Sequence, residues 1–570
     1  MFKPFRRLRR PPPEEATPAG RRVSTPPPDT IRLPVTPLPD GPALFRSPLP
    51  RVRLVGATPR PYDTAVAAAR TCYSAKGIVS PSEVGADSEA DPTRRAKRLE
   101  TRDRIARSIF EAGHHTTLQH AHFTFAIENV SRQFLWSFLH AHPFYNSEQV
   151  SQRYVEVKPG AFAVPALSGE ALSVYERAME AAQEAYRDLS ERLAGPAEAE
   201  YLKRFPGRAK DRDRLAREVQ RRAQEAARYV LPVSTFAFLY HTVSALTLLR
   251  YARASDQYDA PGETRIVVDA MRDAAIEADP ALGVLFEPPI PIERTPEALA
   301  YAAGGWPTES ERAAARRSFD ASLGARASLL VDPDPAGEAR LAAAVREVLG
   351  LPAARLSDDD AIALVLDPSR NAYLDGPLNL SSLSKIMRAG VHVRYTFRKR
   401  LSHTADSQDQ RHRMAPGSRP LLSATVGDEP DVVAPALILA NESVESSFRE
   451  AIARSWEAFR TLKRLGVPAE SALYALPNAL AVRFTESADL LSLRHKMVTR
   501  LCVASQEEIR RASVDEWTAI RAVHPRIGAH LAPPCALRER SGKRPYCPEG
   551  ERFCGVPAWR LPVEALAGQA

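Results

Sequence analysis

The sequence has 570 residues, a formal net charge of +9 and five cysteines. A chain of this length exceeds one ordinary core, so about two large domains are expected. The positive charge favours anionic partners, such as nucleotides, folates or nucleic acid, without choosing among them. The most apolar stretch, residues 231–249, is interrupted by Pro232 and His241. It is therefore not predicted to span a membrane, which needs about 18 or more continuous apolar residues.

Residues 1–50 are rich in proline and arginine and poor in aromatic residues. Such a segment buries too little surface to offset the entropy of ordering, so we predict a disordered arm. Its basic start has no apolar segment typical of a secretory signal, which predicts a cytoplasmic protein without a disulfide framework. A nucleic-acid-binding role for the arginines of this arm is less favoured than a solvated tail.

The periodicity of the remaining chain is mixed. Residues 122–130 and 391–399 alternate like strands, whereas residues 173–195 and 515–524 have helical periodicity. A doubly wound sheet is not favoured, because no glycine-rich G-x-G-x-x-G turn follows a strand. The predicted fold class is α+β, with antiparallel sheet wrapped by helices.

Short signatures recur in the same order in both halves of the chain. They are Arg-x-x-Tyr at Arg70 and Arg370, an aromatic-Thr-Phe strand at 123–125 and 395–397, Leu-Pro at 231–232 and 476–477, and a glutamate at the same spacing beyond each Leu-Pro, Glu263 and Glu508. This order predicts an internal duplication. The predicted domains are the arm (1–50), a first copy (51–290), a linker with helix (291–354), a second copy (355–525) and a cysteine-containing tail (526–570).

The region 113–157 of the first copy contains a distinctive series of motifs. They are Gly113-His114, His120, the Phe-Thr-Phe strand, Ser131-Arg132, Ser151 and Arg153-Tyr154. This series closely resembles the signature region of the flavin-dependent thymidylate synthases. The resemblance implies reductive methylation of dUMP to dTMP, with FAD as cofactor, methylenetetrahydrofolate as carbon donor and NADPH as reductant.

The two copies depart from the family pattern at different positions. Where the family has Arg-His-Arg, the first copy has His140-Ala141-His142 and the second has Arg411-His412-Arg413. Imidazole cannot reproduce the charged, planar donor fork that arginine offers to phosphate, so we expect the first copy to have lost flavin binding. A metal site of His140, His142, His120 and His122 is less favoured, since helical flanks would point the pair apart.

These losses are complementary. The resemblance implies dUMP binding by Ser151, Arg153, Arg228 and Gln408, flavin binding by Arg411, His412 and Arg413, and catalysis by Arg500 and His114. The counterpart of Arg228 in the second copy is Leu473, and that of Arg500 in the first is Ser255. Because the family's sites lie between subunits, we expect the two copies to share one active site.

Further departures leave two functions open. The family's Asn-x-Arg on a late helix is replaced in both copies, by Ser244 and Leu246 and by Asp489 and Leu491. The first function is an active synthase, expected as a homodimer that acts as a pseudo-tetramer. The second is a non-catalytic nucleotide-binding or regulatory protein on the same scaffold.

The tail contains Cys535, Cys547 and Cys554, with His524 and His530 upstream. Three thiolates and an imidazole would complete a closed tetrahedral zinc site, which would order a proline-rich segment. The spacing lacks a compact Cys-x-x-Cys pair, so iron–sulfur ligation and unliganded thiols remain alternatives.

Overall fold

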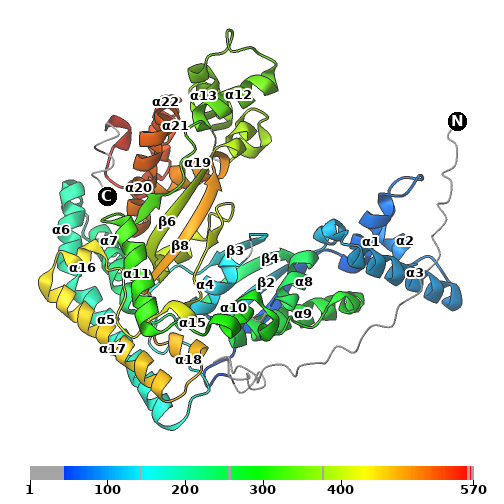
Figure 1. The fold of residues 1–570 in the computed structure, drawn as a ribbon, viewed down its shortest axis with the longest axis horizontal. Helices are drawn as coiled ribbons and strands as arrows, with labels where there is room; N and C mark the ends of the chain where they lie inside the picture. The colour runs from blue at the N-terminus through cyan, green and yellow to red at the C-terminus, as the bar shows by residue number, and fades with distance from the viewer. Residues whose placement is uncertain are drawn as a thin grey trace, which may run out of the picture.

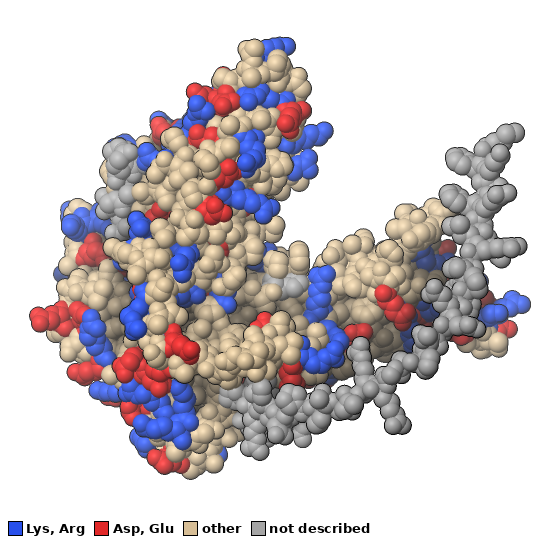
Figure 2. Space-filling view, viewed as in Figure 1, with Lys and Arg blue, Asp and Glu red and all other residues tan. Residues whose placement is uncertain are grey.

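The computed structural model describes residues 44–141, 143–254, 259–374, 376, 378–561 and 565. Helices surround two four-stranded sheets whose strand pairs are all antiparallel, which confirms the predicted α+β class. Figure 1 shows the two sheets in two arms that diverge from a common base. On the face seen in Figure 2, a hollow separates the arms, and acidic and basic side chains are interspersed.

The first sheet lies in one arm. Its strands, in spatial order, are β1 (Arg51–Ala57), β2 (His122–Ser131), β4 (Phe236–Ser244) and β3 (Tyr145–Gln149). Helices α1 (Pro61–Thr71), α8 (Ala245–Arg253) and α9 (Pro261–Ala278) share its hydrophobic core. This arm therefore has a core of its own.

The second sheet repeats the same strand order. Its strands are β5 (Ser328–Leu330), β6 (Arg394–Ser402), β8 (Ala481–Asp489) and β7 (Gly417–Ser418). Because β5 occupies the place of β1, this sheet begins inside the segment predicted as linker. Helix α11 (Glu309–Leu323) precedes β5 and packs on the second sheet, where Asp320 pairs with Arg483 at 2.6 Å.

Two details differ from the sequence expectations. Arg70 lies in the last turn of α1, whereas Arg370 lies beyond the end of α13 (Asp358–Leu366), so the two Arg-x-x-Tyr signatures differ in local structure. Residues 44–50, which the sequence assigned to the disordered N-terminal segment, contact the folded chain. Phe45 pairs with Pro165, and its ring lies 6.2 Å from the ring of Tyr474. Residues 1–43 lie outside the described part of the chain.

The remaining helices complete the two arms and their base. They are α2 (Pro81–Val84), α3 (Pro92–Glu111), α4 (Arg132–His140), α5 (Gly169–Arg192), α6 (Ala194–Arg204), α7 (Arg212–Ala227), α10 (Pro296–Gly304), α12 (Gly337–Leu349), α14 (His403–Asp409), α15 (Leu422–Thr425), α16 (Ala436–Leu439), α17 (Glu442–Arg464), α18 (Ala469–Leu473), α19 (Leu490–Arg500), α20 (Glu507–Val523), α21 (Pro525–His530) and α22 (Pro534–Arg540). Within the described residues, none of these helices has the length and hydropathy needed to cross a bilayer.

The repeated glutamates occupy equivalent places. Ser131 and Ser402 cap the helices that follow β2 and β6. Ser131 donates its backbone N–H and its hydroxyl to Glu263, both at 2.6 Å. Ser402 donates the same two groups to Glu508, at 2.5 and 2.7 Å. The spacing found in the sequence therefore corresponds to one repeated buried contact.

Each glutamate also joins the two copies. Tyr474 of the second copy donates its hydroxyl to Glu263 at 2.6 Å, and Tyr229 of the first donates to Glu508 at 2.6 Å. The backbone adds reciprocal bonds, from Val233 N to Leu476 O and from Asn478 N to Leu231 O, both at 2.8 Å. Helices α5 and α17 lie along this junction (Figure 1) and share one hydrophobic core.

Removing either tyrosine hydroxyl should destabilise the junction. Tyr229→Phe and Tyr474→Phe each leave a buried glutamate without one of its donors, which costs about 1–3 kcal/mol. We expect each variant to unfold at a lower urea concentration than the parent, whereas Tyr73→Phe, at an exposed position, should not. Unchanged midpoints for both buried variants would contradict this account of the junction.

The junction should also weaken as pH rises. Glu470 is buried and accepts hydrogen bonds from the backbone N–H of Gly262 and Glu263, and burial raises the pKa of Glu470 to about 7. A raised folded pKa contributes stability that is full below the unfolded pKa and is lost as pH rises through the folded value. The free energy of unfolding should therefore fall by roughly 3 kcal/mol between about pH 4.5 and 7. Urea titrations should show a shallower pH dependence for Glu470→Gln than for the control Glu450→Gln, at an exposed site on α17.

Candidate active site

Arg500, at the end of α19, lies at the centre of the predicted residues. It is 8% exposed. Its Nε donates to Nε2 of His412 at 2.8 Å, and its Nη2 donates to the carbonyl of Gln408 at 2.7 Å. Because His412 accepts at Nε2, its ring is neutral with the proton on Nδ1. Burial and the charge of Arg500 hold the pKa of His412 well below its usual range.

The Arg-His-Arg motif of the second copy faces strand β3 of the first. Arg411 Nη2 lies 3.2 Å from Glu148, and Arg413 donates to the Asn146 side chain at 3.1 Å. Together with His412, they line a cavity of about 800 Å³ between the copies. Its other polar walls include Gln119, His122, Arg250, Ser492 and His495.

Arg228 is the most isolated of the predicted cations. It is 4% exposed, and its Nε and Nη2 have no hydrogen-bond partner among the described residues. Burial lowers the pKa of Arg228, and the nearby Glu225 opposes that shift. Glu225 itself accepts a hydrogen bond from Arg153 Nε at 2.6 Å. Arg221 lies 3.8 Å from the same carboxylate, so three guanidinium groups share Glu225 here.

Arg153 and the pair Arg411 and Arg413 line different cavities, and Arg228 lines neither of the two. Arg153 lines a cavity of about 780 Å³ formed with α6, α7 and the tail, and it also donates to the carbonyl of Ala504 in the second copy at 3.3 Å. Arg500 lies close to both groups. Burial lowers the pKa of Arg500, Asp409 opposes this, and the charges of Arg411 and Arg153 lower it further.

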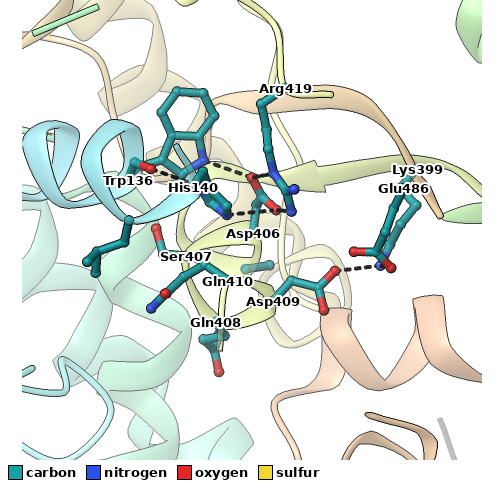
Figure 3. A network of polar contacts seen from close by, with 12 residues as sticks. Trp136, His140, Lys399, Asp406, Ser407, Gln408, Asp409, Gln410, Arg419 and Glu486 are labelled. Carbon is teal, nitrogen blue, oxygen red and sulfur yellow. Dashed lines mark hydrogen bonds and ion pairs between the residues drawn. The ribbon is translucent and has the colours of Figure 1, made fainter. Parts of the chain in front are cut away.

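At the reciprocal interface, His140, the counterpart of Arg411, and Arg419 both lie against Asp406. Figure 3 shows Asp406 between Trp136, His140 and Arg419. Asp406 accepts from Trp136 Nε1 and from Arg419 Nη2, both at 2.8 Å. His140 Nε2 lies 3.6 Å from Asp406, and burial lowers the pKa of His140 to about 4. The carboxylate of Asp406 therefore engages donors of Trp136 and Arg419, whereas His140 Nε2 has no hydrogen-bond partner among the described residues.

Other predicted residues are less central. Ser151 Oγ accepts from the backbone N–H of Arg153 at 3.2 Å, and the Gln408 side chain donates to Thr404 O at 3.4 Å. His114 is exposed before the 3-10 helix η2 (His115–His120) and lines neither cavity. His142 and Ser255 lie outside the described residues.

The predicted metal site in the tail is not supported. Within the described part of the chain, no group of three or more His, Cys, Asp or Glu side chains could hold a metal ion. Cys535 is buried, and Cys554 Sγ donates to the carbonyl of Val556 at 3.7 Å. Burial raises the pKa of Cys535 to about 12, which favours the thiol over the thiolate that a metal requires.

Sequence reasoning missed two residues that position this site. Asn478 of the second copy donates to the Arg228 carbonyl at 3.1 Å and to the Gln152 side chain at 3.3 Å. Glu225 orients Arg153. Asn478 follows directly after the second Leu-Pro, so its place in that repeated signature is the signal that could have identified it.

Comparison with known proteins identifies relatives of both halves. A model of the family described as thymidylate synthase complementing protein matches residues 53–281 and 379–526. The flavin-dependent thymidylate synthase of Clostridium tetani is 27% identical over 235 residues, covering 41% of this chain and 84% of that protein. The enzyme of the same name from Geobacter sulfurreducens is 30% identical over 190 residues, covering 33% and 77%. That from Nitratidesulfovibrio vulgaris is 30% identical over 238 residues, covering 41% and 85%.

A solved structure of a UMP/dUMP methylase from Streptomyces cacaoi, bound with 5-Br dUMP, has a TM-score of 0.28 and 20% identity, covering 41% of this chain and 93% of that one. The family assignment rests instead on the family model. Its two matched segments cover more than half of the sequence and lie on both sheets. The chain therefore belongs to the thymidylate synthase complementing protein family, as the resemblance of its motifs predicted.

Proposed function

We propose that this protein is a flavin-dependent thymidylate synthase that methylates dUMP at one site shared by its two copies. The observation that carries the proposal is the buried guanidinium of Arg228 near Arg153, whose Nε and Nη2 have no hydrogen-bond partner in the described part of the chain. Three relatives that bear the name flavin-dependent thymidylate synthase align with 77–85% of their own length.

The chemistry of Arg228 suits a nucleotide phosphate. Arginine stays charged when buried, and a buried charge without a partner is strongly unfavourable. Glu225 is already bonded to Arg153, so it compensates Arg228 only in part. A phosphate would accept bidentate hydrogen bonds from the free nitrogens of Arg228. Arg153 and Ser151 would complete this end of the dUMP site.

The chemistry of the cavity lined by Arg411 and Arg413 suits FAD. A volume of about 800 Å³ is within the range of cofactor pockets. Arg411 and Arg413 would hold the flavin phosphates, with His412 between them. When bound, the flavin supplies the hydride for methylation, which no amino-acid side chain can provide.

Arg500 connects these two ends. Its proposed role is to stabilise negative charge that develops on the uracil ring, while Gln408 orients that ring. A guanidinium already held by Gln408 and His412 needs little reorganisation to do so. His114, which was predicted as catalytic, is exposed and receives no role in this proposal.

Methylenetetrahydrofolate as the carbon donor, NADPH as the reductant and a homodimeric assembly belong to the same proposal. They rest on the resemblance to the family. Omitting each co-substrate in turn from an assay of tritium release from labelled dUMP tests the first two. Light scattering tests the assembly.

The alternative is a non-catalytic nucleotide-binding protein. It is favoured by the late helices of both copies, where Ser244 and Asp489 serve as helix caps in place of the family's asparagine. A purified protein that binds dUMP, contains no yellow flavin and releases no tritium would support this alternative over the synthase.

Arg228→Met should separate binding from stability. Methionine has a similar length without the charge, so the variant should bind dUMP at least about tenfold more weakly, since a charge-assisted hydrogen bond contributes about 1.5–3 kcal/mol. Without ligand, it should unfold at a higher urea concentration than the parent, because an uncompensated buried charge is removed. Calorimetry with dUMP and urea titration measure the two effects.

The equivalent residue of the second copy provides a matched control. Leu473→Met changes a buried residue of similar volume and should leave dUMP binding unchanged. Arg228→Met that binds dUMP like the parent would overturn the proposed phosphate site.

Flavin binding should be lost without loss of dUMP binding. Arg411→Ala combined with Arg413→Ala removes the proposed phosphate ligands, so bound flavin should fall at least tenfold while dUMP affinity changes little. Flavin absorbance of the purified variant and calorimetry with dUMP measure this. The control Arg449→Ala removes an exposed arginine on α17. Full flavin content in the double variant would contradict the assignment.

A further inference from the structure

Five ionisable side chains are buried together behind the Gln408–His412 segment. They are Lys399, Asp409, Glu486, Lys496 and Glu516, each no more than 2% exposed. We call them the charge cluster. Lys399 Nζ lies 2.5 Å from Asp409, 3.0 Å from Glu516 and 3.5 Å from Glu486. Lys496 pairs with Glu486 and lies 3.2 Å from Asp409.

The cluster has more acids than bases. Two ammonium groups face three carboxyl groups, and Figure 3 shows Asp409 on α14 directed towards Lys399 and Glu486. Oδ1 of Asp409 and Oε2 of Glu486 accept no hydrogen bond from the described residues. The lysines alone therefore do not saturate the carboxyl groups.

The first copy has no Lys, Arg, Asp or Glu at the equivalent positions. The strand register pairs Phe125 with His241 as it pairs Phe397 with Glu486, and Ile127 lies where the second copy has Lys399. The helix caps Ser131 and Ser402, Ser244 and Asp489, and the paired Glu263 and Glu508 fix the rest of the alignment. The five counterparts, in order, are Ile127, Phe138, His241, Tyr251 and Met271.

These counterparts form ordinary core. All five are buried, and the Phe138 ring lies 4.6 Å from Tyr251 and 5.4 Å from His241. The same framework is thus stable without charges, as expected from the large desolvation penalty of buried ion pairs. The charges in the second copy therefore have a purpose other than holding the sheet and helices together.

That copy is the one that contains Arg500. Gln408, which accepts from Arg500, directly precedes Asp409, and the Asp409 carbonyl accepts from the backbone N–H of His412 at 2.9 Å. Arg500 is buried and is repelled by Arg411 and Arg153, and Asp409 is the acid whose charge opposes this. Within the cluster, Asp409 supplies the negative charge that faces these guanidinium groups.

We propose that the charge cluster is a positioning device for Arg500: the Asp409 carboxylate, paired with Lys399 and Lys496, holds the guanidinium against Gln408 and His412. None of the five residues touches the proposed ligands, so each acts through Arg500. The inference rests on the proposed function for the reason why Arg500 must be held in this place. Its physical content, the placement of Arg500, can be tested without any ligand.

The first test follows the Arg500 side chain itself. In the parent, the Arg500 Nε–H bonded to His412 should give a slowly exchanging proton NMR signal, identified by its absence in Arg500→Met. Asp409→Asn keeps the shape and removes the charge, so it should increase the exchange rate of this proton at least tenfold. Asp431→Asn, which removes one of the two acidic partners of Arg483 elsewhere on the second sheet, should leave the Arg500 proton protected. Protection retained in Asp409→Asn would overturn the proposal.

The second test is a double-mutant cycle on dUMP affinity. If Asp409 acts through Arg500, Asp409→Asn should weaken dUMP binding in the parent and have no further effect in Arg500→Met. Equal effects in both backgrounds would mean that Asp409 has only a structural role. Failure of Arg500→Met to weaken binding would contradict the proposed function, while the exchange measurement would still decide the positioning role.

A further variant guards against misfolding. Replacing all five cluster residues with their first-copy counterparts gives a set that already packs together in this protein. If Asp409→Asn does not fold, this variant should show a cooperative thermal transition and the same loss of Arg500 Nε–H protection. A protected proton in this folded variant would refute the inference.

Discussion

The structure depends on two buried glutamates, each of which accepts hydrogen bonds both within its own copy and from the other copy. Glu263 and Glu508 accept the backbone N–H and hydroxyl of the serine at the start of α4 or α14. Each also accepts the hydroxyl of a tyrosine from the opposite copy. A buried carboxyl group requires such partners, so the fold of each copy and the docking of the two are stabilised by the same contacts.

The pairing of the copies is close to symmetric, but its two interfaces differ in charge. At one, Arg153, Arg228 and Arg500 come from both copies, and Arg228 keeps free donors. At the other, Arg419 is bonded to Asp406, and Leu473 replaces Arg228. The first interface has the chemistry to receive a polyanion. At the second, the guanidinium of Arg419 is already paired with Asp406.

Much of this could be predicted from the sequence, because strand alternation and the Leu-Pro and glutamate spacings have direct structural causes. The start of the second copy could not be predicted from the sequence, because its first strand, β5, has only three residues and shows no alternation. The charge cluster did leave a signal. Lys399 has the parity of Tyr395, Phe397 and Leu401 along β6, which places its side chain on the buried face. The zinc site predicted from the tail cysteines was not supported, because spacing along the sequence does not show whether thiols come together around a metal.

The central claim is that two diverged copies form one binding site for dUMP and one for flavin. Calorimetric titration of the flavin-loaded protein with dUMP, with flavin quantified by absorbance, tests this most directly. The account predicts one dUMP and one flavin for each polypeptide chain. Two of either ligand per chain would show that the reciprocal interface also binds, and would contradict the shared site.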